Sequence, residues 1–115
     1  MFSIPQILAG ESFMNIDQLE RDIVATFKPF NPKKIILFGS ISKKDFDEDS
    51  DVDLIIVYDT EKRFMDRLRE LYSQWNIPKA VDILAYTPTE FEMMSSNSFF
   101  VKDALTEGKI IYEKP

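Results

Sequence analysis

The sequence predicts an α/β (α+β) fold in which a mixed β-sheet is flanked by helices, and three observations support this. The chain has 115 residues, the usual size of one domain. Short runs rich in β-branched residues alternate with longer runs whose apolar residues follow helical spacing. The sequence has no repeats or low-complexity linkers. We therefore expect a single domain over residues 1–115, with its core at about 15–112 and residues 1–14 as a candidate N-terminal arm.

The first half of the chain shows one helix signal and two strand signals. Asn15 suits an N-cap, and the apolar residues after it repeat at helical spacing until Pro29 interrupts them. A short apolar run at 33–39 is typical of a buried strand. We expect a turn or short helix through 40–50, followed by a second strand at 51–59.

The second half is predicted to contain five further elements. They are a helix at 61–77, a strand at 79–86, a helix from Thr87, a helix at 98–107 and a strand at 109–113. Thr87 and Glu90 have the spacing of a capping box, and Gly108 suits a left-handed C-cap. We expect the pairs Met93–Met94 and Phe99–Phe100 to pack in the core rather than to face a partner.

The sequence contains no cysteine and no histidine, which narrows its chemistry. Thiol nucleophiles, disulfides, imidazole bases and ordinary zinc sites are excluded. A metal ion would need oxygen ligands, which favours Mg²⁺, Mn²⁺ or Ca²⁺, and proton transfer would fall to a carboxylate, Lys, Tyr or water. The apolar runs are far shorter than the roughly 20 residues of a membrane span. With no targeting signal at the N-terminus, we expect a cytoplasmic protein that contacts no membrane.

The net charge of −6 is concentrated in residues 45–53, which contain six carboxylates and no basic residue. No register of this stretch places Gly and Glu where a calcium-binding loop needs them. A solvated acidic rim that steers a basic partner explains 45–49. It does not explain Asp51 and Asp53, which project to one face at the start of an apolar strand, where unpaired carboxylates repel one another. We therefore favour metal ligation for this pair.

Asp82 supplies a third carboxylate from another apolar strand. Alone, it could equally be an edge residue that faces water or pairs with Lys79. Beside Asp51 and Asp53 on a neighbouring strand, it would complete a cluster. Three carboxylates and a polyphosphate can hold two metal ions for in-line phosphoryl or nucleotidyl transfer.

A candidate phosphate site precedes the acidic stretch. Gly39 allows a close backbone approach, and amide groups at a helix start favour anions. Ser40 adds a hydroxyl donor, and Lys43 follows one turn later. Taken alone, Gly-Ser after a strand is more often an ordinary turn, and the sequence is not a Walker loop. The interpretation depends on the nearby Asp pair.

These residues form a pattern that resembles the DNA polymerase β-like nucleotidyltransferase superfamily. Gly39-Ser40 is followed, after ten residues, by Asp51-Val52-Asp53, and the strand with Asp82 is similar to the family's third-Asp strand. More narrowly, the chain resembles the minimal nucleotidyltransferases (MNT), the antitoxin half of HEPN–MNT toxin–antitoxin pairs. One departure is that residues 41–45 read Ile-Ser-Lys-Lys-Asp where many members have Arg-Ala-Arg-Gly. Lysine replaces the arginine fork only as a point charge, which affects triphosphate binding or nucleotide choice.

The resemblance implies a nucleotidyltransferase fold and a set of site residues. Nucleotide-binding residues would be Gly39, Ser40 and Lys43; catalytic and metal-binding residues would be Asp51, Asp53 and Asp82. Two Mg²⁺ ions are implied, with ATP as the substrate, and Asp82 would help activate the acceptor hydroxyl.

The resemblance also implies a partner. AMP would pass to a tyrosine of a cognate HEPN ribonuclease toxin, which would silence it. The short chain also favours an acceptor supplied by another polypeptide, in a homo- or hetero-oligomer, and we expect no direct nucleic-acid contact. Two alternatives stay open: a non-catalytic antitoxin that masks its toxin, and a nucleotidyltransferase acting on a small molecule or an RNA end.

Overall fold

The computed structural model describes residues 15–39 and 51–115. The elements, in chain order, are α1 (Ile16–Phe27), the short 3-10 helix η1 (Lys28–Phe30), β1 (Lys34–Phe38), β2 (Val52–Val57), α2 (Phe64–Tyr72), β3 (Val81–Tyr86), α3 (Pro88–Asn97), α4 (Phe99–Glu107) and β4 (Lys109–Glu113). The candidate arm at 1–14 and the turn or short helix at 40–50 lie outside the described residues. None of the helices above combines the length and the apolar character that crossing a bilayer requires.

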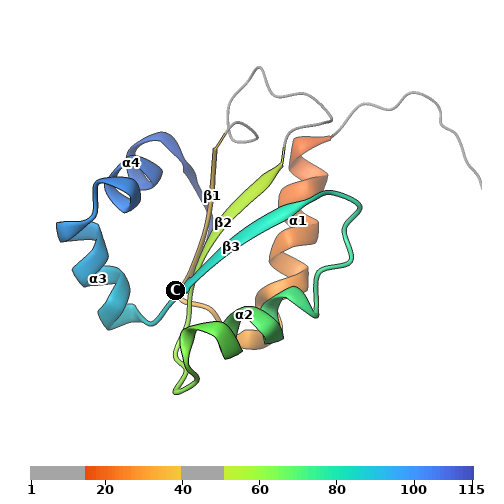
Figure 1. The fold of residues 1–115 in the computed structure, drawn as a ribbon. Coiled ribbons are helices and arrows are strands. Elements are labelled where there is room, and N and C mark those ends of the chain that lie inside the picture. The colour runs from red at the N-terminus through yellow and green to blue at the C-terminus, as the bar shows by residue number, and fades with distance from the viewer. Residues whose placement is uncertain (1–14, 40–50) are drawn as a thin grey trace, which may run out of the picture.

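The four strands form one sheet in the order β3-β2-β1-β4, which confirms the predicted mixed sheet. β1 runs antiparallel to both β2 and β4, whereas β2 and β3 are parallel and are joined through α2. Figure 1 shows β1 and β2 at the centre of the sheet. The central strands are almost wholly buried, as expected for strands covered on both faces.

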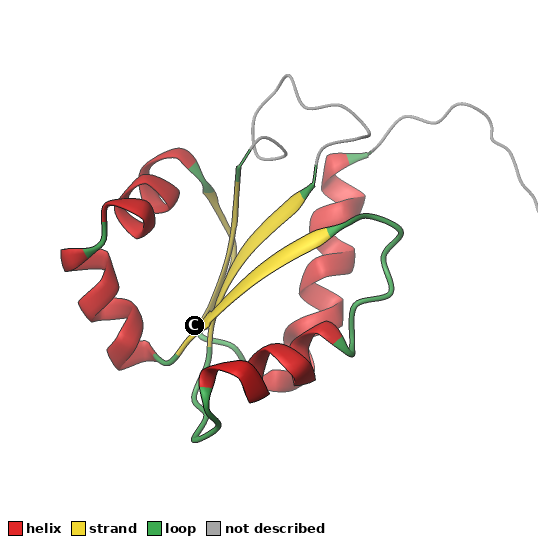
Figure 2. Cartoon of the chain, viewed as in Figure 1, coloured by secondary structure: helices red, strands yellow, loops and turns green. Residues whose placement is uncertain are grey.

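Helices cover both faces of the sheet, so the molecule has three layers (Figure 2). Side chains alternate along β1: Ile35 and Leu37 enter a core with α1 and α2, while Ile36 enters a second core with α3 and α4. Phe38 packs partly against this second core. The α3/α4 face is therefore the one toward which Ile36 and Phe38 project.

Two predicted helix starts are confirmed. The backbone N–H of Gln18 donates to Asn15 Oδ1 at 3.1 Å, and Thr87 and Glu90 form a reciprocal capping box. The helix predicted at 61–77 is shorter at both ends, since α2 begins at Phe64 and ends at Tyr72. Trp75 lies beyond it, where its indole N–H donates to the Lys79 carbonyl at 2.8 Å. That bond and burial against Phe27 satisfy the side chain without helical backbone.

Gly108 does not have the left-handed conformation that we predicted, because its φ is −91° and its ψ −173°. Glycine is needed there for space. A Cβ atom would collide with the Ala104 carbonyl oxygen and lie 2.8 Å from the Leu37 carbonyl oxygen. The chain therefore passes from α4 into β4 close against β1.

The expectation of core packing for the pairs 93–94 and 99–100 is wrong for three of the four residues. Met93 is 61 % exposed, Phe99 85 % and Phe100 54 %, while Met94 packs partly against the α3/α4 core. The α3/α4 helices are short, and each presents few residues to the sheet. Their buried residues are Phe91, Val101 and Ala104. The remaining apolar side chains are left at the surface.

A buried arginine joins α2, β3 and α3. Arg67 is 7 % exposed, and its guanidinium donates to the Ala85 carbonyl oxygen and to both carboxylate oxygens of Glu90. A hydrogen bond from Arg67 and another from the Thr87 backbone lower the pKa of Glu90. The bidentate pair satisfies a charge that would otherwise be costly to bury.

Replacing Glu90 by Gln tests this pair, since Gln can keep the capping box but not the charge. We expect Glu90→Gln to lower the free energy of unfolding at pH 7 by about 1 kcal/mol, a low value because the Glu90 side chain is 44 % exposed. The folded pKa lies below the ordinary 4.5, so this stability is present above pH 4.5 and is lost as the pH falls through the folded value. Urea unfolding at several pH values measures it. Glu92→Gln, an exposed change on the same helix, is the control, and equal effects of the two variants would contradict the prediction.

Candidate active site

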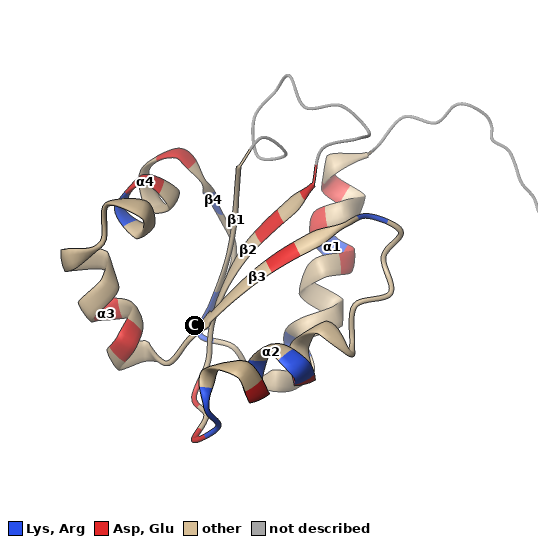
Figure 3. Ribbon diagram, viewed as in Figure 1, with Lys and Arg blue, Asp and Glu red and all other residues tan. Residues whose placement is uncertain are grey.

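Three side chains form a row across one end of the sheet. The register pairs Phe38 of β1 with Asp53 of β2, and Asp53 with Asp82 of β3. All three residues lie on the α3/α4 face of the sheet. Each is two residues along its strand from Ile36, Ile55 or Leu84, which form the next row and pack in the α3/α4 core. We call Phe38, Asp53 and Asp82 the site row. Figure 3 shows the acidic segments of β2 and β3 lying next to each other.

Asp51 adds a third carboxylate just before β2 begins. Burial raises the pKa of Asp53, and the nearby charges of Asp82 and Asp51 raise it further. Asp51 and Asp82 are exposed, whereas Asp53 is half-buried. The structure thus brings the three predicted carboxylates close enough to repel one another, with Asp53 at the centre.

Gly39 shapes the edge of this cluster. It follows β1 directly and has a φ of +78°, in the left-handed region that favours glycine. A Cβ atom at Gly39 would collide with Asp53 Oδ2 and lie 3.1 Å from Asp53 Cγ. Backbone and carboxylate are therefore in close contact, and the predicted neighbour relation between the Gly-Ser turn and the Asp pair is present for Gly39. Ser40 and Lys43 lie outside the described residues.

The sequence interpretation missed the aromatic side chains beside the carboxylates. Phe38 occupies the third position of the site row, and its ring meets that of Phe100 edge to face, with centroids 5.5 Å apart. The position of Phe38 directly before Gly39 was the available signal. Phe100 gave none, because its proximity depends on how α4 packs on β1.

The donor set fits a hard cation such as Mg²⁺, because it consists of carboxylate oxygens alone. Asp53 and Asp82 stand in register on adjacent strands, so their side chains can reach a shared ion. Within residues 15–39 and 51–115, no three acidic side chains are gathered into a ready-made metal-binding group. Phosphate oxygens of a substrate, or residues from other parts of the chain, would have to complete the coordination.

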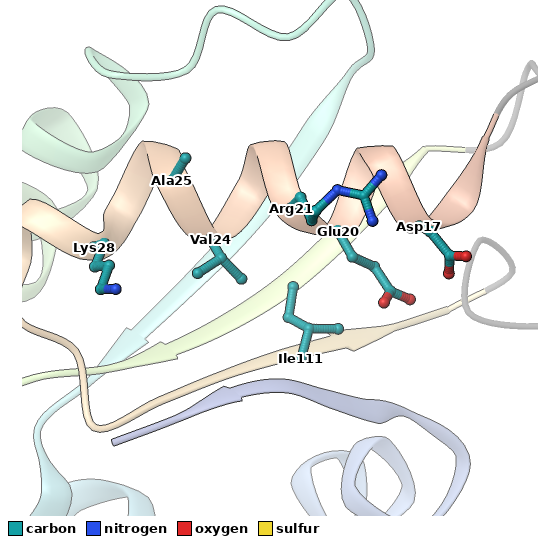
Figure 4. Close-up of a pocket in the computed structure, with 7 residues that line it drawn as sticks. All are labelled: Asp17, Glu20, Arg21, Val24, Ala25, Lys28 and Ile111. Carbon is teal, nitrogen blue, oxygen red and sulfur yellow. The ribbon is translucent and has the colours of Figure 1, made fainter. Parts of the chain in front are cut away.

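The hollows of the described residues that lie away from the site row include two with charged side chains in their lining. Figure 4 shows one of about 440 Å³ between α1 and β4, with Glu20, Arg21 and Lys28 on its rim. Lys109 already pairs with Glu20 there at 2.9 Å. The second, of about 310 Å³, adjoins Tyr86 at the opposite end of β3 from Asp82. Neither hollow contains the convergent carboxylates that the site row offers.

A mixed sheet with paired carboxylates beside a glycine turn defines a class of proteins that transfer phosphoryl or nucleotidyl groups on bound metal ions. The chain belongs to the family "Polymerase beta, Nucleotidyltransferase", which it matches over residues 21–115. It is therefore a nucleotidyltransferase, and the predicted superfamily is confirmed.

Two relatives come from Methanocaldococcus jannaschii. The chain is 35 % identical over 82 residues, 70 % of its length and 78 % of the relative's, to "Putative protein adenylyltransferase MJ0604". It is 30 % identical over 74 residues, 64 % of its length and 80 % of the relative's, to "Putative protein adenylyltransferase MJ0435".

Two crystal structures share the fold. One is named a "putative nucleotidyltransferase" from Sulfolobus solfataricus, with a TM-score of 0.52 and 15 % identity over 92 % of this chain and 94 % of that one. The other is named "the toxin-antitoxin with AMP-PNP", with a TM-score of 0.55 and 24 % identity over 83 % of this chain and 73 % of that one. Both likenesses support the nucleotidyltransferase fold.

The contact between Gly39 and Asp53 can be tested by a double-mutant cycle. We expect Gly39→Ala to destabilise the protein by about 1–2 kcal/mol through its left-handed backbone, and further through the collision with Asp53 Oδ2. In a protein that also contains Asp53→Ala, Gly39→Ala should cost only the backbone contribution, because Asp53 Oδ2 is no longer present. Urea unfolding of the four proteins measures the coupling. An equal cost of Gly39→Ala in both backgrounds would show that the close contact is absent.

Proposed function

We propose that this nucleotidyltransferase is a Mg²⁺-dependent, cytoplasmic antitoxin that transfers AMP from ATP to a tyrosine hydroxyl of a cognate HEPN ribonuclease toxin. One observation carries the catalytic part: Asp53 and Asp82 stand in register, with Asp51 close by and Gly39 packed against Asp53. A protein that only masks a toxin has no need of like charges held together beside a glycine that packs against one of them.

The comparisons support the acceptor and the partner. The two archaeal relatives are named for adenylyl transfer to protein, which favours a protein over a small molecule as the acceptor. The structure named for a toxin–antitoxin with AMP-PNP favours a toxin partner and an adenine nucleotide. The HEPN class and the tyrosine come from the resemblance of the sequence motif.

The site residues divide into metal ligands and phosphate-binding residues. Asp51, Asp53 and Asp82 would hold two Mg²⁺ ions, and Gly39, with Ser40 and Lys43 from the sequence motif, would bind the triphosphate. Bound Mg²⁺ supplies a Lewis acid that neutralises phosphate charge and lowers the pKa of an acceptor hydroxyl, which suits a chain without histidine. The closeness of Gly39 to Asp53 would hold the phosphates near the carboxylates.

The proposed transfer is an in-line displacement. The tyrosine oxygen forms a bond to the α-phosphorus as the bond from that phosphorus to the bridging oxygen of the β-phosphate breaks. Pyrophosphate leaves with the electron pair of the broken bond. The hydroxyl proton passes to the Asp82 carboxylate, which lies on the edge strand where an acceptor can approach.

Neutralising the carboxylates should separate catalysis from binding. We expect the double change Asp51→Asn and Asp53→Asn to reduce the transfer of labelled AMP at least 1000-fold, because two of the three proposed metal ligands are lost. Fold and toxin binding should persist, since removing like charges relieves repulsion. The assay mixes the protein, the HEPN protein encoded beside it, labelled ATP and Mg²⁺.

Asp59→Asn is the matched control, because Asp59 is exposed beyond the other end of β2, where it makes one long ion pair with Lys33. It should transfer AMP like the parent. If the Asp51/Asp53 variant protected cells as well as the parent, antitoxin action would rest on binding rather than transfer.

A further inference from the structure

We propose that the nucleobase of the bound nucleotide stacks on the ring of Phe100, which α4 holds against Phe38 of the site row. The inference rests on the proposed function, since it presumes a nucleoside triphosphate at the site row. It assigns a base subsite to a helix outside the sequence motif.

The Phe100 ring is linked to the carboxylates by one neighbour. Phe38 stands next to Asp53 in the site row, and the Phe38 and Phe100 rings meet at 85° with centroids 5.5 Å apart. This edge-to-face geometry is a favourable aromatic arrangement that restrains Phe100. Phe100 is 54 % exposed, so about half of its surface is open to a ligand.

The packing of α4 fixes the helix that carries this ring. Val101, the next residue, and Ala104 are buried in the α3/α4 core. At the other end of the helix, Gly108 lies close against β1. A Cβ atom added to Gly108 would lie 2.8 Å from the Leu37 carbonyl oxygen and 3.0 Å from Phe38 Cβ. Phe100 is therefore presented by a helix anchored on β1, the strand that leads into the Gly39 turn.

The direction of the transfer places the base on this side. In an in-line displacement the acceptor and the leaving pyrophosphate lie on opposite sides of the α-phosphorus. The ribose stays bonded to that phosphorus and extends roughly at right angles to the line between them. The proposed pyrophosphate site is at Gly39, directly after the end of β1, and the proposed acceptor site is at the β3 edge of the sheet. The sheet itself lies beneath the α-phosphorus, so the ribose cannot extend in that direction. It would extend over the α3/α4 face, where the Phe100 ring contacts Phe38 of the site row.

Phe99 is the neighbouring aromatic candidate, but its surroundings differ. The Lys102 ammonium lies 5.8 Å from the centre of the Phe99 ring, a cation–π contact that occupies one face. Within the described ranges, Phe99 makes no ring contact with Phe38 or another residue of the site row. Phe100 is thus the ring that stacking on the nucleotide would use, and Phe99 serves as an internal control.

The test compares two ligands by calorimetry on the full chain: MgATP and magnesium tripolyphosphate, which lacks ribose and base. We expect Phe100→Ala to weaken MgATP binding about tenfold and to leave tripolyphosphate binding unchanged, because stacking on an aromatic side chain contributes to the base alone. Phe100→Tyr should restore MgATP binding, while Phe99→Ala should bind both ligands like the parent. Circular dichroism checks that each variant is folded.

The outcomes separate the two proposals. If the parent bound neither ligand, the proposed function would fail and the base subsite with it. If the parent bound MgATP and Phe100→Ala bound it equally well, only the base subsite would be overturned. A loss in Phe99→Ala instead of Phe100→Ala, or equal losses for both ligands, would overturn it as well. Loss of toxin binding by Phe100→Ala with normal MgATP affinity would identify the ring as a partner contact.

Discussion

The register of β1, β2 and β3 is the constraint on which the rest of the structure depends. Because side chains alternate between the faces of a strand, one shared register sorts three strands into rows on the α3/α4 face. The inner row, Ile36, Ile55 and Leu84, is apolar and packs under α3 and α4. The outer row contains Phe38, Asp53 and Asp82. A slip of one residue would turn the carboxylates into the opposite core, so packing and site geometry are specified by the same hydrogen bonds.

Much of this arrangement could be predicted from local sequence. The strands have a local signal in their runs of β-branched residues, the Asn15 cap and the Thr87 capping box rest on interactions within a few residues, and all are present. The pairing of Asp53 with Asp82 was expected from two apolar strands that each contain a carboxylate near their start. Local signals also located Gly39, whose positive φ is a property of its own backbone.

The features that could not be predicted depend on long-range packing. Helical spacing continues past Tyr72, yet α2 ends there, and Trp75 beyond the helix packs against Phe27 and donates to the Lys79 carbonyl oxygen. Gly108 follows a helix, which predicts a left-handed cap, but its role is to allow close approach to Leu37 of another strand. The exposure of Phe99 and Phe100 likewise follows from the small number of residues that α4 buries.

The shortness of α4 also explains how a core and a polar site share one face. α4 runs back toward the site row and ends at Glu107, and Gly108 then turns the chain into β4 beside Leu37. The helix therefore covers the inner row with Val101 and Ala104 but leaves Asp53 only half-buried. A longer helix would bury Asp53 further, and burial already raises the pKa of this carboxyl group. A shorter one would remove the contact between Phe100 and Phe38. The length of α4 therefore meets both requirements, because the helix covers the inner row and keeps Phe100 in contact with Phe38 of the outer row.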